Sequence, residues 1–95
     1  MTQRTSTVPA KVMTVVTATD DVTGPIRAIL VSGGPVEFLG AVTGGTPADR
    51  EGAIPVRNMG DGFDGTQTLD ALFGDPTIVR LYVLAEAEAI ISVAY

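Results

Sequence analysis

The sequence predicts an all-β fold, a small β-sandwich or a partly open β-barrel of about six to seven short strands with a flexible N-terminal arm. Short runs rich in Val, Ile and Thr alternate with Gly, Pro and Asp almost to the end of the chain. Turn residues at roughly every eight to twelve positions are typical of such folds. The chain has 95 residues, which suits one domain. We assign residues 1–10 to the arm and residues 11–95 to a single β-domain.

The arm is predicted from its lack of periodicity. The first ten residues are mainly polar, with one Pro near their end. Such a terminus is disordered by itself or ordered by a neighbouring molecule. We therefore expect that deletion of the arm leaves the fold intact.

The first three strands are expected at Lys11–Ala18, Ile26–Val31 and Pro35–Val42, which are rich in β-branched and apolar residues. Between the last two lies the pair Gly33-Gly34. Two successive Gly residues accommodate the positive φ angles of a tight turn. The sequence therefore predicts that the second and third strands form a hairpin.

Two further strands are expected at Ala53–Asn58 and Thr77–Leu84. The first contains Pro55, which has no N–H to donate to a neighbouring strand, so we expect it at the edge of a sheet. In the second, Leu81 and Val83 alternate with polar positions, so one face of this strand is expected in the core.

The last segments leave alternatives open. Residues 66–73 suit either a strand or a single helical turn. Residues 85–89 have high helix propensity but alternate Ala and Glu with period two, and a β-prone run follows them. We interpret the C-terminal segment as a strand that forms a hairpin with the strand before it.

Composition indicates a protein that packs against partners. Ala, Val, Ile, Leu, Met, Phe and Gly together form about 55% of the residues, above the usual 45–50%. Charged residues form only 18%, where about 25% is ordinary. A small domain has much surface per residue, so this apolar excess favours a homo-oligomer or a docking surface.

The charge argues against nucleic-acid binding. The net charge is −5, and the six Lys and Arg residues are scattered, whereas affinity for nucleic acids comes mainly from clustered cations. We also expect no membrane attachment, because the most apolar stretch, residues 78–94, is interrupted by charged residues.

The sequence offers little for catalysis, since it contains no His and no Cys. The usual pairs of nucleophile and base therefore cannot be built. Two carboxylate pairs, Asp20/Asp21 and Asp61/Asp64, could supply acid and base groups, but Asp beside Gly is more typical of a turn. We expect no enzymatic activity, no catalytic residue and no cofactor.

Ligand motifs are weak in the same way. Asn58, Asp61 and Asp64 could supply oxygen ligands to calcium, but the EF-hand spacing and its final Glu are absent, so we expect an ordinary loop and no metal. Gly33-Gly34 and Gly44-Gly45 could cradle a phosphate, but neither pair precedes a credible helix.

Several segments follow one another in an order known from a class of viral proteins. They are Arg27-Ala28-Ile29-Leu30-Val31, Gly33-Gly34, Val36-Glu37-Phe38, Ile54-Pro55-Val56-Arg57 and Ile78-Val79-Arg80-Leu81-Tyr82. Through these segments, which cover about half of the chain, the sequence resembles the small β-rich virion structural proteins of tailed phages. The types concerned are capsid decoration (cement) proteins and head-spike-base proteins. The resemblance implies a β-domain on the capsid surface, made in the host cytoplasm, whose partner is the major capsid protein or another virion protein.

The function expected is therefore that of a decoration protein that binds and stabilises the capsid shell as a homo-oligomer, preferably a trimer. The alternatives are a head-spike base, neck or tail component, and a small cytosolic module that binds a peptide or sugar through the loops Thr43–Gly52 and Met59–Gly65. Phe38 is expected in the core, whereas Phe63 is either a docking anchor or a core residue. The residues expected to contact a partner are Thr2, Gln3, Arg4, Thr5, Val8, Phe63 and Tyr95.

Overall fold

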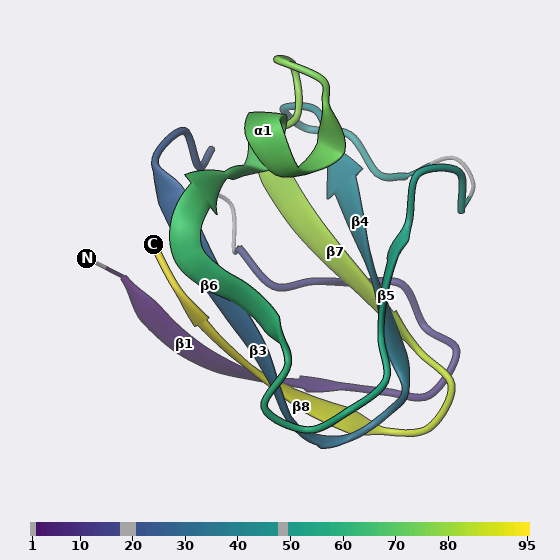
Figure 1. The fold of residues 1–95 in the computed structure, drawn as a ribbon. Coiled ribbons are helices and arrows are strands. Elements are labelled where there is room, and N and C mark those ends of the chain that lie inside the picture. The colour runs from purple at the N-terminus through teal and green to yellow at the C-terminus, as the bar shows by residue number, and fades with distance from the viewer. Residues whose placement is uncertain (1, 18–20, 48–49) are drawn as a thin grey trace.

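The computed structural model describes residues 2–17, 21–47 and 50–95, which form two four-stranded antiparallel sheets packed face to face (Figure 1). Sheet A has the strand order β1 (Gln3–Val8), β8 (Ala89–Ala94), β3 (Pro25–Gly33), β6 (Gly62–Thr68). Sheet B has the order β2 (Thr14–Val15), β7 (Arg80–Ala85), β4 (Val36–Ala41), β5 (Ile54–Val56). The predicted all-β fold is confirmed, and two separate sheets make it a sandwich.

The core lies between the two sheets and follows the period of two that strands impose. On β8, Ala89, Ile91 and Val93 are buried, while the residues between them face away from the core. On β7, Leu81 and Val83 are buried in the same core, as the alternation in the sequence predicts. Phe38 is fully buried on β4, so its predicted place in the core is confirmed.

The helix α1 (Leu69–Phe73) follows β6 directly. Thr68 is its N-cap, and the hydroxyl oxygen of Thr68 accepts a hydrogen bond from the Ala71 N–H. The fully buried Leu69 anchors this turn to the core. The stretch 66–73, which the sequence leaves undecided, is therefore strand in its first part and helix in its second.

The predicted hairpin around Gly33-Gly34 is wrong, although both residues have the positive φ angles expected. β3 pairs with β8 and β6, whereas β4 pairs with β7 and β5. The turn therefore carries the chain from sheet A to sheet B. The physical reason is that β3 and β4 each have one strongly apolar face. Across the core these two faces pack against each other, whereas in a flat hairpin they would lie side by side in one sheet.

The C-terminal segment is also a strand, but the predicted hairpin with its predecessor is wrong for the same reason. β7 lies in sheet B and β8 in sheet A, where β8 pairs with β1 and β3. The connection through residues 86–88 stacks beside the Gly33-Gly34 turn, and the Glu86 N–H donates to the Pro35 carbonyl over 3.0 Å.

The flexible N-terminal arm is a further correction. Gln3–Val8 form β1, which pairs with β8 over its whole length in unbroken register. Val8 is completely buried. The Thr and Ser residues that make the segment look unstructured also suit a strand at a sheet edge, and Val8 supplies the apolar anchor.

The other boundaries differ in detail. The strand expected at Lys11–Ala18 is reduced to β2, and Ala18 lies outside the described residues. Strand β6 begins at Gly62, so the expected loop Met59–Gly65 is shorter. β5 is an edge strand with Pro55 at its centre, as predicted.

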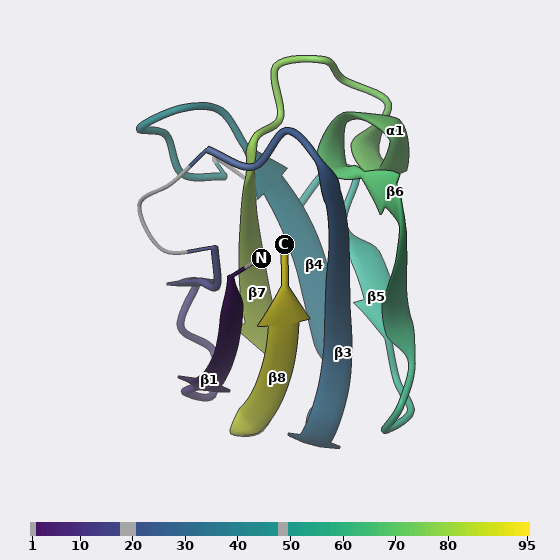
Figure 2. The same cartoon turned by 90° about the vertical axis from the view of Figure 1, so that its left-hand side faces the viewer.

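The outer faces of the two sheets differ. A second apolar cluster lies on sheet B, where Leu39, Ala41 and Tyr82 are buried and the Tyr82 hydroxyl donates to the Gly45 carbonyl. Sheet A has no such layer: Figure 2 views it from outside, and no described segment crosses in front of β1, β8 and β3. Among the described residues, no helix is long and apolar enough to cross a membrane.

Candidate functional site

The predicted contact residues at the N-terminus lie along the outer margin of sheet A. Gln3 and Thr5 are exposed on β1, and Arg4 is half-buried. The backbones of Thr2 and Tyr95 exchange two hydrogen bonds just beyond the strand. The structure thus brings Thr2, Gln3, Arg4 and Thr5 together with Tyr95 at one edge of the sandwich.

Val8 and Phe63 are corrected as contact residues, because their side chains belong to the core. Val8 is 0% exposed and Phe63 is 7% exposed. The Phe63 ring lies 4.9 Å from the Phe38 ring and 6.2 Å from the Phe73 ring, measured between centroids. Of the two alternatives for Phe63, the core residue is therefore correct: the strand β6 points its side chain inward.

Tyr95 is partly buried, and its side chain serves the fold. The Tyr95 hydroxyl donates a hydrogen bond to the Thr17 carbonyl over 2.8 Å. The Thr17 hydroxyl in turn accepts from the Leu81 N–H in the buried interior. This chain of hydrogen bonds ties the C-terminus to sheet B.

The carboxylates form turns and a surface ion pair. Asp21 accepts hydrogen bonds from the Thr43 hydroxyl (2.6 Å) and the Arg80 guanidinium (3.2 Å), which together hold its pKa below the usual range. Asp20 lies outside the described residues. An acid catalyst needs the opposite, a raised pKa, so Asp21 is poorly suited to that role.

The proposed calcium ligands Asn58, Asp61 and Asp64 bracket the start of β6 and do not share one loop. The Asp64 carboxylate accepts hydrogen bonds from the Thr66 hydroxyl (2.6 Å) and the Thr66 N–H (3.0 Å), which lower its pKa. Within the described ranges, no three His, Cys, Asp or Glu side chains are grouped so that they could hold a metal ion.

The two Gly pairs serve the backbone. Gly33-Gly34 joins the sheets, and Gly44-Gly45 lies in the loop after β4. The one helix of the described chain, α1, follows neither pair. Neither pair therefore has the helix start that a phosphate cradle requires.

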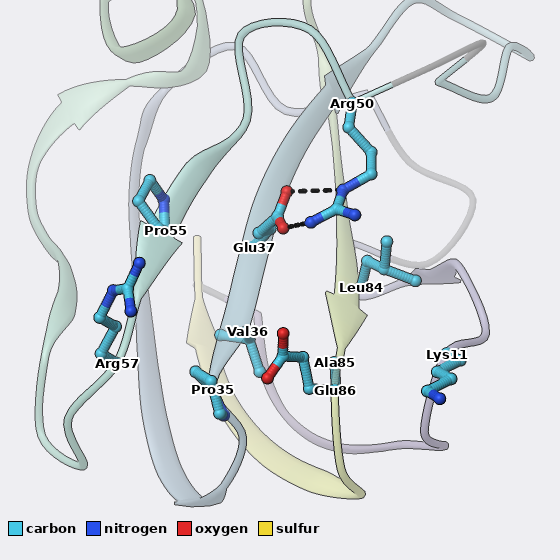
Figure 3. Close-up of a pocket in the computed structure, with 10 residues that line it drawn as sticks. All are labelled: Lys11, Pro35, Val36, Glu37, Arg50, Pro55, Arg57, Leu84, Ala85 and Glu86. Atoms are coloured by element: carbon cyan, nitrogen blue, oxygen red, sulfur yellow. Dashed lines mark hydrogen bonds and ion pairs between the residues drawn. The ribbon is translucent and has the colours of Figure 1, made fainter.

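A shallow cleft of about 370 Å³ lies over β4 and β7 on the outside of sheet B (Figure 3). Pro35 and Leu84 supply apolar surface, and Lys11 and Glu86 lie toward one end. Across the cleft, Arg50 forms a bidentate ion pair with Glu37, and the Arg50 Nε lies 3.0 Å from a Glu37 oxygen.

Lys11 in this cleft has an unusual backbone. Its φ of 61° lies in the left-handed region, which costs a residue with a side chain about 1–2 kcal/mol. The Lys11 N–H donates to the Ala85 carbonyl over 2.7 Å, which holds the residue in this conformation. The position of Lys11 at the cleft is therefore fixed by the backbone.

A second surface is the outer side of sheet A, which we call the sheet A face. It consists of the outward residues of the three neighbouring strands: Gln3, Thr5, Thr7, Arg27, Ile29, Val31, Ser32, Ile90, Ser92 and Ala94. Arg27 is the one charged side chain among them, and it lies at the end of the face, opposite Ala94 on β8 and Asp64 on β6.

Sequence reasoning found Gln3 and Thr5 but missed the rest of this face. The alternation along residues 89–94 carries the signal, because Ala89, Ile91 and Val93 are buried and the intervening positions must then point outward. The neighbours of β8 could not be known without the pairing of the strands, since β1 and β3 are distant in sequence.

Comparisons with protein-family models, with curated proteins and with solved structures found no match to this chain. The functional argument therefore rests on the geometry and chemistry of the surfaces described above.

Proposed function

We propose that the chain is a non-enzymatic virion structural protein, a capsid decoration protein that binds and stabilises the capsid shell as an oligomer. The observation that carries this proposal is the sheet A face, a surface over three strands whose one charged residue is Arg27 at its end, with no described segment in front of it. Sheet B, by contrast, has an apolar cluster of its own on its outside.

The chemistry of the sheet A face suits protein contact. Interface centres are depleted in charged residues, and a polar rim surrounds them. The face follows this pattern, with Ile29, Ile90 and Ser92 near its middle and Arg27 and Asp64 at its margin. The exposed Val31, with 48% of its surface accessible, gains apolar burial when a partner covers it.

Binding only to the assembled shell is sufficient to stabilise it. A ligand that binds one state of an equilibrium and not the other shifts the equilibrium by mass action. Each decorating copy that spans neighbouring capsid subunits must be released before one of them can leave. The same face would serve a head-spike base, neck or tail component, which differs only in the identity of its partner.

The test is binding of the purified chain to assembled shells of the virus that encodes it, measured by co-sedimentation. Ser92→Arg places a long cation in the middle of the sheet A face, and we expect it to weaken binding at least about tenfold, which corresponds to about 1.4 kcal/mol. Ala71→Arg is the matched control, because Ala71 is exposed on α1, away from this face, and should leave binding unchanged.

If both variants bind as the unmodified chain does, the sheet A face is not the contact. If the unmodified chain itself stays in the supernatant, the decoration role is refuted.

The second candidate is a small binding module, which the cleft on sheet B favours. Lys11 and Arg57 supply cations beside the apolar surface of Pro55 and Leu84, a combination that suits an extended peptide with a carboxylate. Of the described residues in the loops Thr43–Gly52 and Met59–Gly65, which the sequence predicts as the binding loops of such a module, Arg50 alone lines the cleft.

A further inference from the structure

The open edge of β1 is the most regular sheet edge in the described chain, and Arg4 is its one charged residue. Natural edge strands are shortened, interrupted by Pro or bulges, or charged, because a free edge can pair with another chain. β2 has only two residues, and β5 has three with Pro55 among them. β6 is irregular, because its pairing with β3 shifts register between Pro25 and Arg27, as at a β-bulge. β1 has six residues, no Pro and a continuous register, and Arg4 alone among its side chains is charged.

The hydrogen-bonding groups that face this open edge can be identified. Thr2 and Tyr95 exchange both of their backbone hydrogen bonds. In an antiparallel pair of strands, residues that exchange both backbone hydrogen bonds alternate with residues that exchange none. Arg4, Ser6 and Val8 therefore also bond to β8 through their backbones. The N–H and C=O groups of Gln3, Thr5 and Thr7 therefore point to the open side, where no described residue bonds to them.

We propose that β1 pairs antiparallel with β1 of a second copy of this chain, across a two-fold axis at Thr5. Each Thr5 then lies opposite Thr5 of the second copy, and each Gln3 lies opposite Thr7. This register uses every free backbone group of the strand, in about six hydrogen bonds. It joins the two A sheets into one continuous sheet and extends the sheet A face across both copies.

A second copy fits this edge electrostatically. The chain has a net charge of −5, so two copies repel one another over most of their surfaces. Residues 2–10 contain no carboxylate and only one cation, Arg4. The edge of β1 is therefore a place where two acidic copies approach without direct repulsion.

The residues on either side of Thr5 favour this register. An axis at Thr5 sets Arg4 of one copy opposite Ser6 of the other, so the two Arg4 side chains do not lie directly opposite one another. An axis at Thr7 would instead set Thr5 opposite Pro9, which has no N–H to donate.

The pairing gives a dimer in place of the trimer expected of a decoration protein. A two-fold contact uses the same edge of both copies and is closed once two are joined. The inference does not depend on capsid binding: a dimer that ignores shells would support the pairing and refute only the proposed function.

The test uses charge reversal at the two-fold axis, read as molecular mass by sedimentation velocity over a concentration series. Thr5→Lys and Thr5→Glu each set two like charges directly opposite one another, and we expect each to raise the dissociation constant of the dimer roughly tenfold or more. An equimolar mixture of the two variants sets Lys opposite Glu and should restore the dimer.

Thr7→Lys is the matched control. Thr7 is exposed on the same strand, but it lies opposite Gln3 in the proposed register, so its charge meets no like charge. We expect this variant to dimerise as the unmodified chain does. Circular dichroism and thermal unfolding confirm that each variant is folded.

Three results would overturn the proposal. One is an unmodified chain that stays monomeric up to about millimolar concentration, where a specific pairing should be populated. The second is a dimer that Thr5→Lys leaves intact. The third is a dimer that Thr7→Lys disrupts as strongly as Thr5→Lys does, which would place the axis elsewhere.

Discussion

At Gly33 the end of β3 passes against the turn that joins β7 to β8. A Cβ atom added there would lie 1.9 Å from the Glu88 carbonyl oxygen, far inside contact distance, and φ is +78°. Gly44 has a similar φ of +69° but nothing within 4 Å of the same position. Substitution of Gly44 by Ala therefore measures the cost of a positive φ alone, whereas substitution of Gly33 adds the cost of steric overlap with the Glu88 carbonyl.

We predict that Gly33→Ala lowers the free energy of unfolding by about 3 kcal/mol and Gly44→Ala by only about 1 kcal/mol. Chemical denaturation of both variants measures the difference. Equal losses would mean that the turns at residues 33 and 88 are not packed together as the structure places them.

Other residue roles differ in how far the sequence determines them. The local roles are readable: Asp64 beside Thr66 and Thr68 before Leu69 are short-range turn and cap patterns, and the structure has both. The sequence leaves Phe63 undecided because the direction of its side chain depends on where β6 begins. β6 begins at Gly62, among Gly and Asp residues that are more typical of a loop than of a strand. The sequence assigns Val8 wrongly to a partner contact, because a single apolar residue in a polar segment gives no hydrophobic alternation from which its burial could be predicted.

At the scale of elements, the sequence predicts where strands occur better than it predicts which strands pair. β4, β5 and β7 lie within or near their expected ranges. Both expected hairpins, β3 with β4 and β7 with β8, cross between the sheets. A turn with flexible Gly residues is compatible with either outcome, and the choice is made by burial of apolar faces across the core, which local sequence does not report.

The strand β1 gives a prediction that reverses the one made from the sequence. Deletion of residues 2–8 removes the fully buried Val8 and the whole ladder between β1 and β8. Burial of one Val side chain contributes about 1.5–3 kcal/mol, so we expect a loss of about 3 kcal/mol or more of stability, or no folded protein. Unfolding of the truncated chain by denaturant measures this.

Val8→Ala is the control for that deletion, since it removes only part of one side chain and keeps the strand. It should cost less than the deletion. A truncated chain as stable as the full one would show that residues 2–8 are a flexible arm after all.

At the scale of the whole molecule, the outer surfaces of the two sheets of the sandwich differ. Sheet B carries its own apolar cluster on its outside, while sheet A presents a face with one charged residue, Arg27, and a regular open edge at β1. The apolar excess of the sequence predicts a partner surface, but it does not indicate which side of the sandwich carries it. That information exists only once strands distant in the chain are brought together in sheet A.

The central proposal is that this chain is a virion component, and its copy number in purified virus particles tests this most directly. Quantitative mass spectrometry should find the chain in a fixed ratio to the major capsid protein, in an even number of copies per binding site if β1 pairs as proposed. A chain found only in the fraction of unassembled proteins would contradict the account.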